Sequence, residues 1–169
     1  MRFCWLFVLF CLISCSPDKK PSSVSFYYWK TRVALQPREK QVLEDNNVEK
    51  IYLRYFDIGL KNDQPFPISS VIFGEIPNAK IVPVIYIKNE VMLHPKVDVK
   101  KLAALMLSYI DQINNHYHLS TQEIQLDCDW SLKSKQKFFS LLRSLKEQRQ
   151  LTYSATIRLH QIKFFKETG

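Results

Sequence analysis

The stretch Glu123-Ile124-Gln125-Leu126-Asp127-Cys128-Asp129-Trp130 decides how the rest of the chain is interpreted. Its polar and apolar residues alternate, which is typical of a strand because successive side chains point to opposite faces. Gln125, Asp127 and Asp129 then share one face. A helix pattern follows, and other strand-then-helix units surround it, so we expect both faces to be covered. The two carboxylates are therefore predicted to point into an enclosed space, either a barrel interior or a cleft.

The rest of the chain repeats this alternation. Further strands are predicted at 24–30, 50–57, 80–87 and 152–160, and helices at 38–43, 99–113 and 138–145. Residues 59–77 are rich in turn residues, so we expect a long loop there with a short extended piece at 71–73. Pro83 argues against a central strand at 80–87, since proline lacks the amide hydrogen that such a strand uses, although the apolar run favours one.

This order predicts an α/β fold with a parallel sheet built from (β/α) units. Five strands fit either an open doubly wound sheet or the first five strands of a TIM-like barrel. A complete barrel needs about 250 residues, whereas this chain has 169. We therefore expect a truncated barrel that does not close, with its fifth strand as an open edge.

The N-terminus has the layout of a signal peptide: Arg2 precedes an apolar run at 3–13, which is short for a membrane span. The run ends in Leu12-Ile13-Ser14-Cys15, which resembles the lipobox of bacterial lipoproteins. The resemblance implies cleavage before Cys15 and acylation of that residue. We expect a signal peptide at 1–14, a lipidated tether at 15–23, a partial barrel domain at 24–169, and anchoring at the bacterial cell envelope, in the outer membrane. The alternative is an ordinary secreted protein.

The composition excludes several classes of partner and site. The net charge is +8, but the basic residues are scattered over predicted helix faces, so we expect no nucleic-acid partner for an exported chain. Weak attraction to anionic lipid is compatible with this charge. With Cys15 lipidated, Cys128 has no disulfide partner in the mature chain and is predicted to be a buried apolar residue.

The strand at 123–130 resembles the signature strand of the chitinase-type glycoside hydrolases, a TIM-barrel group with the motif D-x-x-D-x-D-x-E on its fourth strand. Asp127 and Asp129 match the second and third acids of that motif. Ile124 stands in place of the first acid, and Ser131 in place of the glutamate that donates the proton. The resemblance implies a barrel with inward-facing acids, and it leaves hydrolysis without its usual proton donor.

A second resemblance covers most of the mature chain. The phrases at 26–31, 51–57, 124–130 and 155–162 resemble those of a family of bacterial lipoproteins with glycoside-hydrolase-like barrels. This resemblance implies a fold but no particular activity. Members of that family continue beyond the point that corresponds to Gly169, which is a further reason to expect a truncated barrel.

Two charged side chains on other strands are predicted to meet the aspartates. Alternation places Arg54 on the same side of its strand as Phe56, and Arg158 on the same side as His160. One interpretation is a buried ion-pair network in which Arg54 and Arg158 neutralise the two aspartates, because an unpaired buried charge is costly. The other is a site at the C-terminal ends of barrel strands.

The site interpretation gives each residue a role in carbohydrate binding or cleavage. Asp129 and Asp127 are candidate catalytic groups with Asp57 as a further carboxylate, since glycosidic cleavage uses one protonated and one ionised carboxyl group. Arg54, Arg158 and His160 are candidate substrate-binding residues, and His160 could equally be a simple hydrogen-bonded side chain. The candidate platforms for sugar rings are Trp29, Tyr86 and Trp130, although the two tryptophans fit a core equally well.

No cofactor is predicted, because the sequence lacks a glycine-rich phosphate loop, a zinc-type Cys/His cluster and a nucleophile elbow. Asp57, Asp127, Asp129 and His160 are suitable metal ligands by type, but nothing fixes their spacing, so no metal is predicted. The leading hypothesis is a membrane-anchored lipoprotein that binds carbohydrate and hydrolyses it if active. The alternative is a non-catalytic interaction or scaffold lipoprotein that reuses the barrel.

Overall fold

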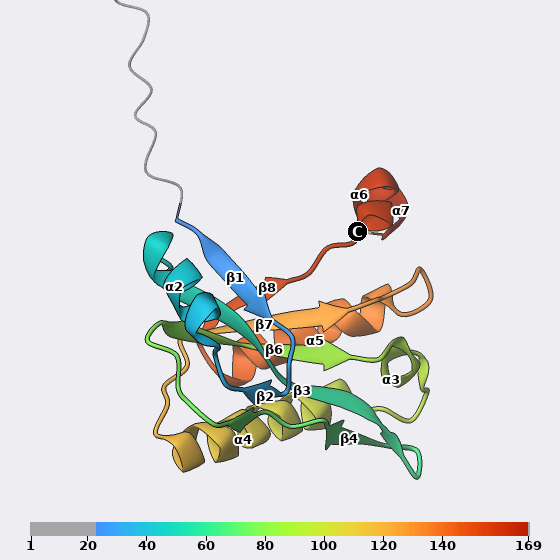
Figure 1. Cartoon of the computed structure of the whole chain (residues 1–169). Coiled ribbons are helices and arrows are strands. Elements are labelled where there is room, and N and C mark those ends of the chain that lie inside the picture. The colour runs from blue at the N-terminus through green and yellow to red at the C-terminus, as the bar shows by residue number, and fades with distance from the viewer. Residues whose placement is uncertain (1–22, 169) are drawn as a thin grey trace, which may run out of the picture.

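The computed structural model describes residues 23–168 and shows a mixed α/β fold around a mostly parallel sheet (Figure 1). Five parallel strands lie in the order β1-β3-β6-β7-β8. Their bounds are β1 (Ser25–Tyr28), β3 (Lys50–Lys61), β6 (Lys80–Ile87), β7 (Glu123–Cys128) and β8 (Thr152–Ala155). Among the described residues β1 and β8 are the two edges of this path, so the sheet is open and no barrel closes.

The helices are α2 (Pro37–Asp45), α3 (Asn89–Leu93), α4 (Val99–Tyr117), α5 (Lys135–Gln148), α6 (Leu159–Lys163) and α7 (Phe165–Thr168). The predicted cap of α4 is confirmed: Asp98 Oδ1 accepts the backbone N–H groups of Lys100 and Lys101. No helix among residues 23–168 is long and apolar enough to cross a membrane. The predicted signal peptide and Cys15 lie outside the described residues.

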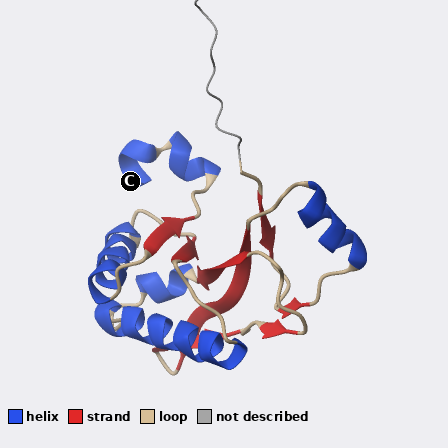
Figure 2. Cartoon of the chain, turned by 90° about the vertical axis from the view of Figure 1, so that its left-hand side faces the viewer, coloured by secondary structure: helices blue, strands red, loops and turns tan. Residues whose placement is uncertain are grey.

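Helices α4 and α5 cover one face of the sheet (Figure 2). The apolar face of α4, which includes Leu102, Met106 and Ile110, is fully buried. It packs in a single core with the apolar residues of β7 and with Phe138 of α5. The predicted apolar side of β7 is therefore confirmed as a core face, and Cys128 lies in it as a buried free thiol whose pKa burial raises to about 12.

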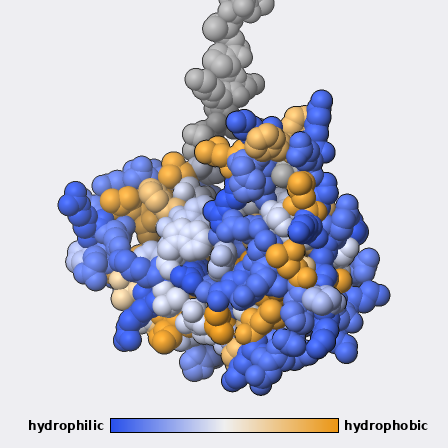
Figure 3. Space-filling view, turned by 90° about the vertical axis from the view of Figure 1, so that its right-hand side faces the viewer, coloured by the Kyte–Doolittle hydropathy of each residue, from blue (hydrophilic) through white to orange (hydrophobic). Residues whose placement is uncertain are grey.

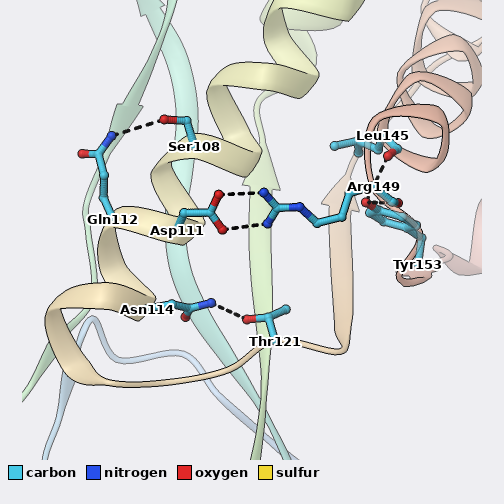
Figure 4. A network of polar contacts seen from close by, with 8 residues as sticks. All are labelled: Ser108, Asp111, Gln112, Asn114, Thr121, Leu145, Arg149 and Tyr153. Carbon is cyan, nitrogen blue, oxygen red and sulfur yellow. Dashed lines mark hydrogen bonds and ion pairs between the residues drawn. The ribbon is translucent and has the colours of Figure 1, made fainter.

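Polar contacts also tie α4 to α5 on the outside of this core (Figure 4). Arg149 donates to both carboxylate oxygens of Asp111, at 2.7 and 2.6 Å. At the end of α4, Asn114 Nδ2 donates to Thr121 Oγ1 at 2.7 Å, which fixes the turn that leads into β7. This outer Arg–Asp pair is a structural clamp between two helices.

The segment predicted as a long loop at 59–77 is partly a hairpin. Strand β3 runs to Lys61, turns at Asn62 and Asp63, which both have positive φ, and returns as β4 (Gln64–Ile68) antiparallel to it. Two prolines are tolerated in β4 because it pairs with β3 alone. The extended piece is β5 (Ile72–Phe73), which pairs with β2 (Arg32–Val33) in a separate two-stranded sheet.

The sheet curls toward the face opposite α4 and α5. Adjacent strands lie about 4.8 Å apart, so a flat sheet would separate β1 from β7 by three such spacings. The Tyr27 hydroxyl of β1 nevertheless donates a hydrogen bond to Gln125 Oε1 of β7, across β3 and β6. The side chains between them on β6 are Val82 and Val84, which are buried and lie outside the main core. We call this surface the concave face.

A β-bulge in β3 changes which of its residues reach the concave face. The pairing of β3 with β6 shifts between Arg54 and Phe56, so one extra residue, Tyr55, is inserted. Beyond the bulge Phe56 turns into the core, and the prediction that it shares a side with Arg54 is wrong. Asp57 instead comes to the same side as Arg54, because the bulge reverses the alternation.

Candidate functional site

Strand register sets polar side chains in rows across the concave face. Asp57 of β3 pairs in register with Tyr86 of β6, and Tyr86 pairs with Asp127 of β7. These three residues form what we call the upper row, near the C-terminal ends of the strands. Lower on the same face, Tyr52 aligns with Val82 of β6, and Glu123 of β7 lies two residues below Gln125. The upper row places two carboxyl groups on either side of a tyrosine.

Arg158 connects the two aspartates of β7. Its Nη2 donates to Asp127 Oδ1 at 2.8 Å, and its Nε donates to Asp129 Oδ1 at 2.5 Å. The predicted meeting of Arg158 with both aspartates is thus confirmed. Arg54 does not join them: it makes two hydrogen bonds to Asp57, at 2.8 and 2.5 Å. The bulge explains this difference, since it places Asp57 beside Arg54.

The two aspartates of β7 lie in different surroundings. Asp127 is 2% exposed, whereas the Asp129 side chain is 47% exposed. Burial raises the pKa of Asp127; the charge on Asp129 adds to this rise, and Arg158 opposes it. Burial also raises the pKa of Tyr86, and the charges of Asp129, Asp127 and Asp57 add to that rise while Arg158 opposes it. Tyr86 therefore lies within electrostatic reach of three carboxyl groups.

We call Asp57, Asp127 and Asp129, together with Arg54, Arg158 and Tyr86, the carboxylate cluster. It contains one more acid than base, so its formal charge is negative when all its carboxyl groups are ionised. Its charged groups are paired but not sealed off, because the Arg54 and Arg158 side chains are about one third exposed. The cluster thus combines a buried acid, Asp127, with groups that solvent or a ligand can reach.

Lower on the concave face, Glu123 is held on several sides. Lys50 Nζ donates to its Oε2 at 2.7 Å, and the hydroxyls of Tyr52 and Ser154 donate to its Oε1 at 3.3 and 3.0 Å. Burial alone would raise the pKa of Glu123, but the hydrogen bonds from Lys50, Ser154 and Tyr52 outweigh it, and the pKa is lowered. This carboxylate is a structural hub that links three strands.

An aromatic ladder lies at the open edge of the concave face. The rings of Tyr27 and Tyr52 stack with centroids 5.0 Å apart, and Trp29 stacks on Tyr27 at 5.8 Å with nearly parallel planes. Trp29 is 46% exposed. A half-exposed indole held flat by a second ring suits contact with an apolar ligand surface, and the role of Trp29 as a platform for sugar rings stays a prediction.

Two predicted site residues lie elsewhere. Trp130 is 3% exposed and stacks on Phe138 of α5 at 4.5 Å, so it is a core residue and no sugar platform. The sequence predicts His160 on strand five, but that strand ends at Ala155 and His160 lies exposed on α6. Among the described residues, no side-chain hydrogen bond or ion pair joins His160 to the carboxylate cluster. The strand prediction at 156–160 is wrong because the chain turns outward as Arg158 reaches back to the aspartates.

Ser131, in the position of the missing glutamate, lies in the loop between β7 and α5. Its backbone N–H donates to Ser134 Oγ at 2.8 Å, and Ser134 Oγ donates to Asn89 Oδ1 at 2.7 Å. These bonds join the loop after β7 to α3. Ser131 therefore has a structural role, and the described residues show no carboxyl group in its place.

Gln161 supports the site, although the sequence pattern did not predict this role. It is 1% exposed; its Oε1 accepts the Arg158 N–H at 2.7 Å, and its Nε2 donates to the Trp130 carbonyl at 3.4 Å. It thereby holds the backbone of Arg158 against the end of β7. The available signal was a glutamine three residues after a helix start, the spacing of a capping box, and the predicted strand concealed it.

The geometry can bind a polar ligand and can move a proton. Carboxylates and guanidinium groups at one strand end offer both acceptors and donors to hydroxyl groups, and Asp127 is an acid with a raised pKa. Within residues 23–168, no group of three or more His, Cys, Asp or Glu side chains is arranged to hold a metal ion. Comparisons with protein-family models, with curated proteins and with solved structures found no match. The functional argument therefore depends on this geometry.

Proposed function

We propose that this chain is a lipid-anchored protein of the bacterial cell envelope that binds carbohydrate at its carboxylate cluster. The observation that supports this most is the bridge from Arg158 to both Asp127 and Asp129, beside Tyr86, at the C-terminal ends of parallel strands. Ligands of parallel α/β folds bind at this end of the strands. The lipid anchor rests on the lipobox-like sequence before Cys15.

The chemistry of the cluster suits a sugar. Each hydroxyl of a pyranose can donate to a carboxylate and accept from a guanidinium, and the cluster offers both kinds of group. The apolar face of the same ring can pack on an indole, and Trp29 presents such a ring at the edge of the concave face. Substrate binding is thus assigned to Arg54, Arg158, Tyr86, Asp129 and Trp29.

The same observations favour the first five units of a (β/α) barrel as the finer description of the fold. The sheet is parallel, it curls away from α4 and α5, and its concave side chains lie in rows set by strand register. Filling an interior by such rows is characteristic of these barrels. In this description the carboxylate cluster is the part of the barrel interior that faces the catalytic end.

Hydrolysis of the bound glycan is a second candidate function, and the raised pKa of Asp127 favours it. In this scheme Asp127 donates its proton to the glycosidic oxygen as that bond breaks, and Asp129 activates the attacking water or attacks the sugar carbon itself. Arg158 has to release Asp127 for the proton to reach substrate. Against hydrolysis stands Ser131, which leaves a scaffold or binding role as the non-catalytic alternative.

A glycan array tests the binding proposal. The full chain should retain a set of envelope or exopolysaccharide fragments, and Asp129→Asn should lose them because it removes the charge with little change of shape. Asp45→Asn is the matched control, since Asp45 is exposed at the end of α2. Equal retention by wild type and Asp129→Asn would contradict the proposal.

A hydrolysis screen on the same protein separates the two functions. Release of reducing ends that disappears in both Asp127→Asn and Asp129→Asn would establish hydrolysis. Retention of glycans without any turnover would establish the binding role alone.

A further inference from the structure

The C-terminal helices expose apolar side chains and bury a polar one. Gln161 of α6 faces the domain and is 1% exposed, whereas Leu159 is 85% exposed. A surface helix of a globular domain normally has the opposite arrangement, with its apolar stripe against the core. We call the exposed set the C-terminal patch; it consists of Ile157, Leu159, Ile162, Phe164 and Phe165, each between 46% and 85% exposed.

The patch projects from the domain. Helices α6 and α7 stand apart from the sheet in both ribbon views (Figures 1 and 2). On the side of the molecule that includes them, hydrophobic side chains lie among hydrophilic ones at the surface (Figure 3). Gln161 and the Arg158 bridge hold α6 in this position. A projecting group of large apolar side chains is suited to insertion into a soft apolar phase.

The charges around the patch are mainly positive. Lys163 and Lys166 are exposed beside it, and Lys163 lies over the Phe164 ring at 5.3 Å from its centroid. The one carboxylate among residues 157–167 is Glu167, and the whole chain has a net charge of +8. Lysines beside Leu, Ile and Phe are typical of segments that lie in the headgroup region of anionic membranes.

The described chain begins at the same end of the molecule as the patch. Both ribbon views place the start of β1 and helices α6 and α7 toward that end. Cys15 precedes residue 23 by eight positions, a length of chain that spans at most about 28 Å. A lipid on Cys15 would therefore keep the patch within reach of the bilayer surface.

We propose that the C-terminal patch docks on an anionic lipid bilayer, with Leu159 and Phe165 inserted and Lys163 and Lys166 at the headgroups. The inference uses the lipid anchor proposed at Cys15 but is independent of carbohydrate binding. It predicts an orientation in which the membrane holds α6, and with it Arg158, in a fixed place. A second copy of the chain on the same patch is the competing occupant.

Hydrogen exchange of the full chain on vesicles tests this docking. On phosphatidylcholine vesicles that contain phosphatidylglycerol, the amides of 159–165 should exchange at least about tenfold more slowly than on pure phosphatidylcholine. The double variant Leu159→Ser and Phe165→Ser should lose this protection. The matched control is Phe66→Ser with Ile72→Ser, two exposed apolar residues on β4 and β5, and this control should keep the protection.

Two results would overturn the proposal. Equal exchange on both kinds of vesicle would show that anionic lipid does not cover the patch. Slow exchange of these amides without vesicles, becoming slower as the protein concentration rises, would identify a second copy as the occupant. Because no glycan is present, failure here leaves the carbohydrate proposal untouched. Equal glycan retention by wild type and Asp129→Asn would overturn the carbohydrate proposal and leave this one untouched.

Discussion

Glu123 and Asp127 lie on the same strand and the same face, four residues apart, yet their surroundings shift them in opposite directions. Glu123 receives hydrogen bonds from a lysine and two hydroxyls, and its pKa is lowered. Asp127 is more deeply buried beside a second carboxylate, and its pKa is raised despite Arg158. The comparison teaches that the same strand face satisfies one carboxylate fully with hydrogen-bond donors and leaves the other, in the upper row, as an acid with a raised pKa.

The strongest test of the lower region is Lys50→Met, which leaves Glu123 half buried without its cation. We expect a loss of about 2 kcal/mol in the free energy of unfolding, measured by urea denaturation, with glycan binding unchanged. Lys40→Met is the control, because the pair of Lys40 with Glu75 is exposed and is worth less than about 0.5 kcal/mol. Equal losses in the two variants would contradict a structural role for Glu123.

A smaller loss of stability is expected from Arg158→Met in the upper row. Asp127 can take up a proton when Arg158 is gone, so the free energy of unfolding should fall by only about 1 kcal/mol. The pKa of Asp127 should rise further, since Arg158 is the group that lowers it most, and glycan binding should be lost. A carboxyl-detected NMR titration measures the pKa of Asp127. An unchanged pKa would show that the bridge does not form in solution.

The pH dependence of stability should differ in sign between the two carboxyl groups. Because folding raises the pKa of Asp127, its contribution is full below the usual value of 3.8 and is lost as pH rises through the raised pKa. Because folding lowers the pKa of Glu123, its contribution is present above 4.5 and is lost as pH falls through the lowered pKa.

Two substitutions separate these contributions. In urea denaturation repeated across acidic pH, Asp127→Asn should remove the loss of stability that occurs as pH rises. Glu123→Gln should remove the loss of stability that occurs as pH falls. If both variants lost stability in the same direction of pH, the two carboxyl groups would not differ.

Gln161→Leu should have a local effect. Without its hydrogen bonds to Arg158 and Trp130, α6 should open more often, so the amides of 159–163 should exchange faster by about fivefold. Global stability should change by less than about 0.5 kcal/mol, because α6 is a short terminal helix. Global destabilisation without any local change in exchange would contradict this role for Gln161.

The smallest effect is expected from Arg149→Lys in the outer clamp of Figure 4. This half-exposed pair joins α4 to α5 and faces solvent, so its loss should cost about 0.3 kcal/mol and leave glycan binding intact. A loss of binding would show that the outer clamp influences the concave face.

Alternation and helix periodicity predicted much of the fold. They placed the parallel strands, the cap of α4 at Asp98, the core face of β7 and the meeting of Arg158 with Asp127 and Asp129. These features follow from local spacing, which a sequence shows directly. The apolar run at 80–87 also predicted its strand correctly. Pro83 does not prevent this strand, because it precedes the first residue of β6 that pairs with β7.

The errors arose where tertiary contacts override local pattern. A bulge has no signature in an apolar run, so the arrival of Asp57 beside Arg54 could not be derived from alternation. Trp130 is a different case: it shares the parity of Ile124 and Cys128, so its packing on Phe138 follows the alternation, and the sugar-platform prediction went against that pattern. The prediction for His160 is wrong because the polar–apolar alternation at 156–160 continues the strand pattern past Ala155, where the chain instead leaves the sheet and begins α6.

A single carboxyl-detected NMR titration of the labelled full chain compares Glu123 and Asp127 most directly. The account predicts that Asp127 releases its proton above its usual pKa of 3.8 and Glu123 below its usual pKa of 4.5. Folding then makes Asp127 a weaker acid and Glu123 a stronger one. If Asp127 instead titrates below its usual value, Arg158 neutralises it as a settled ion pair. The upper row would then be structural, like the region around Glu123.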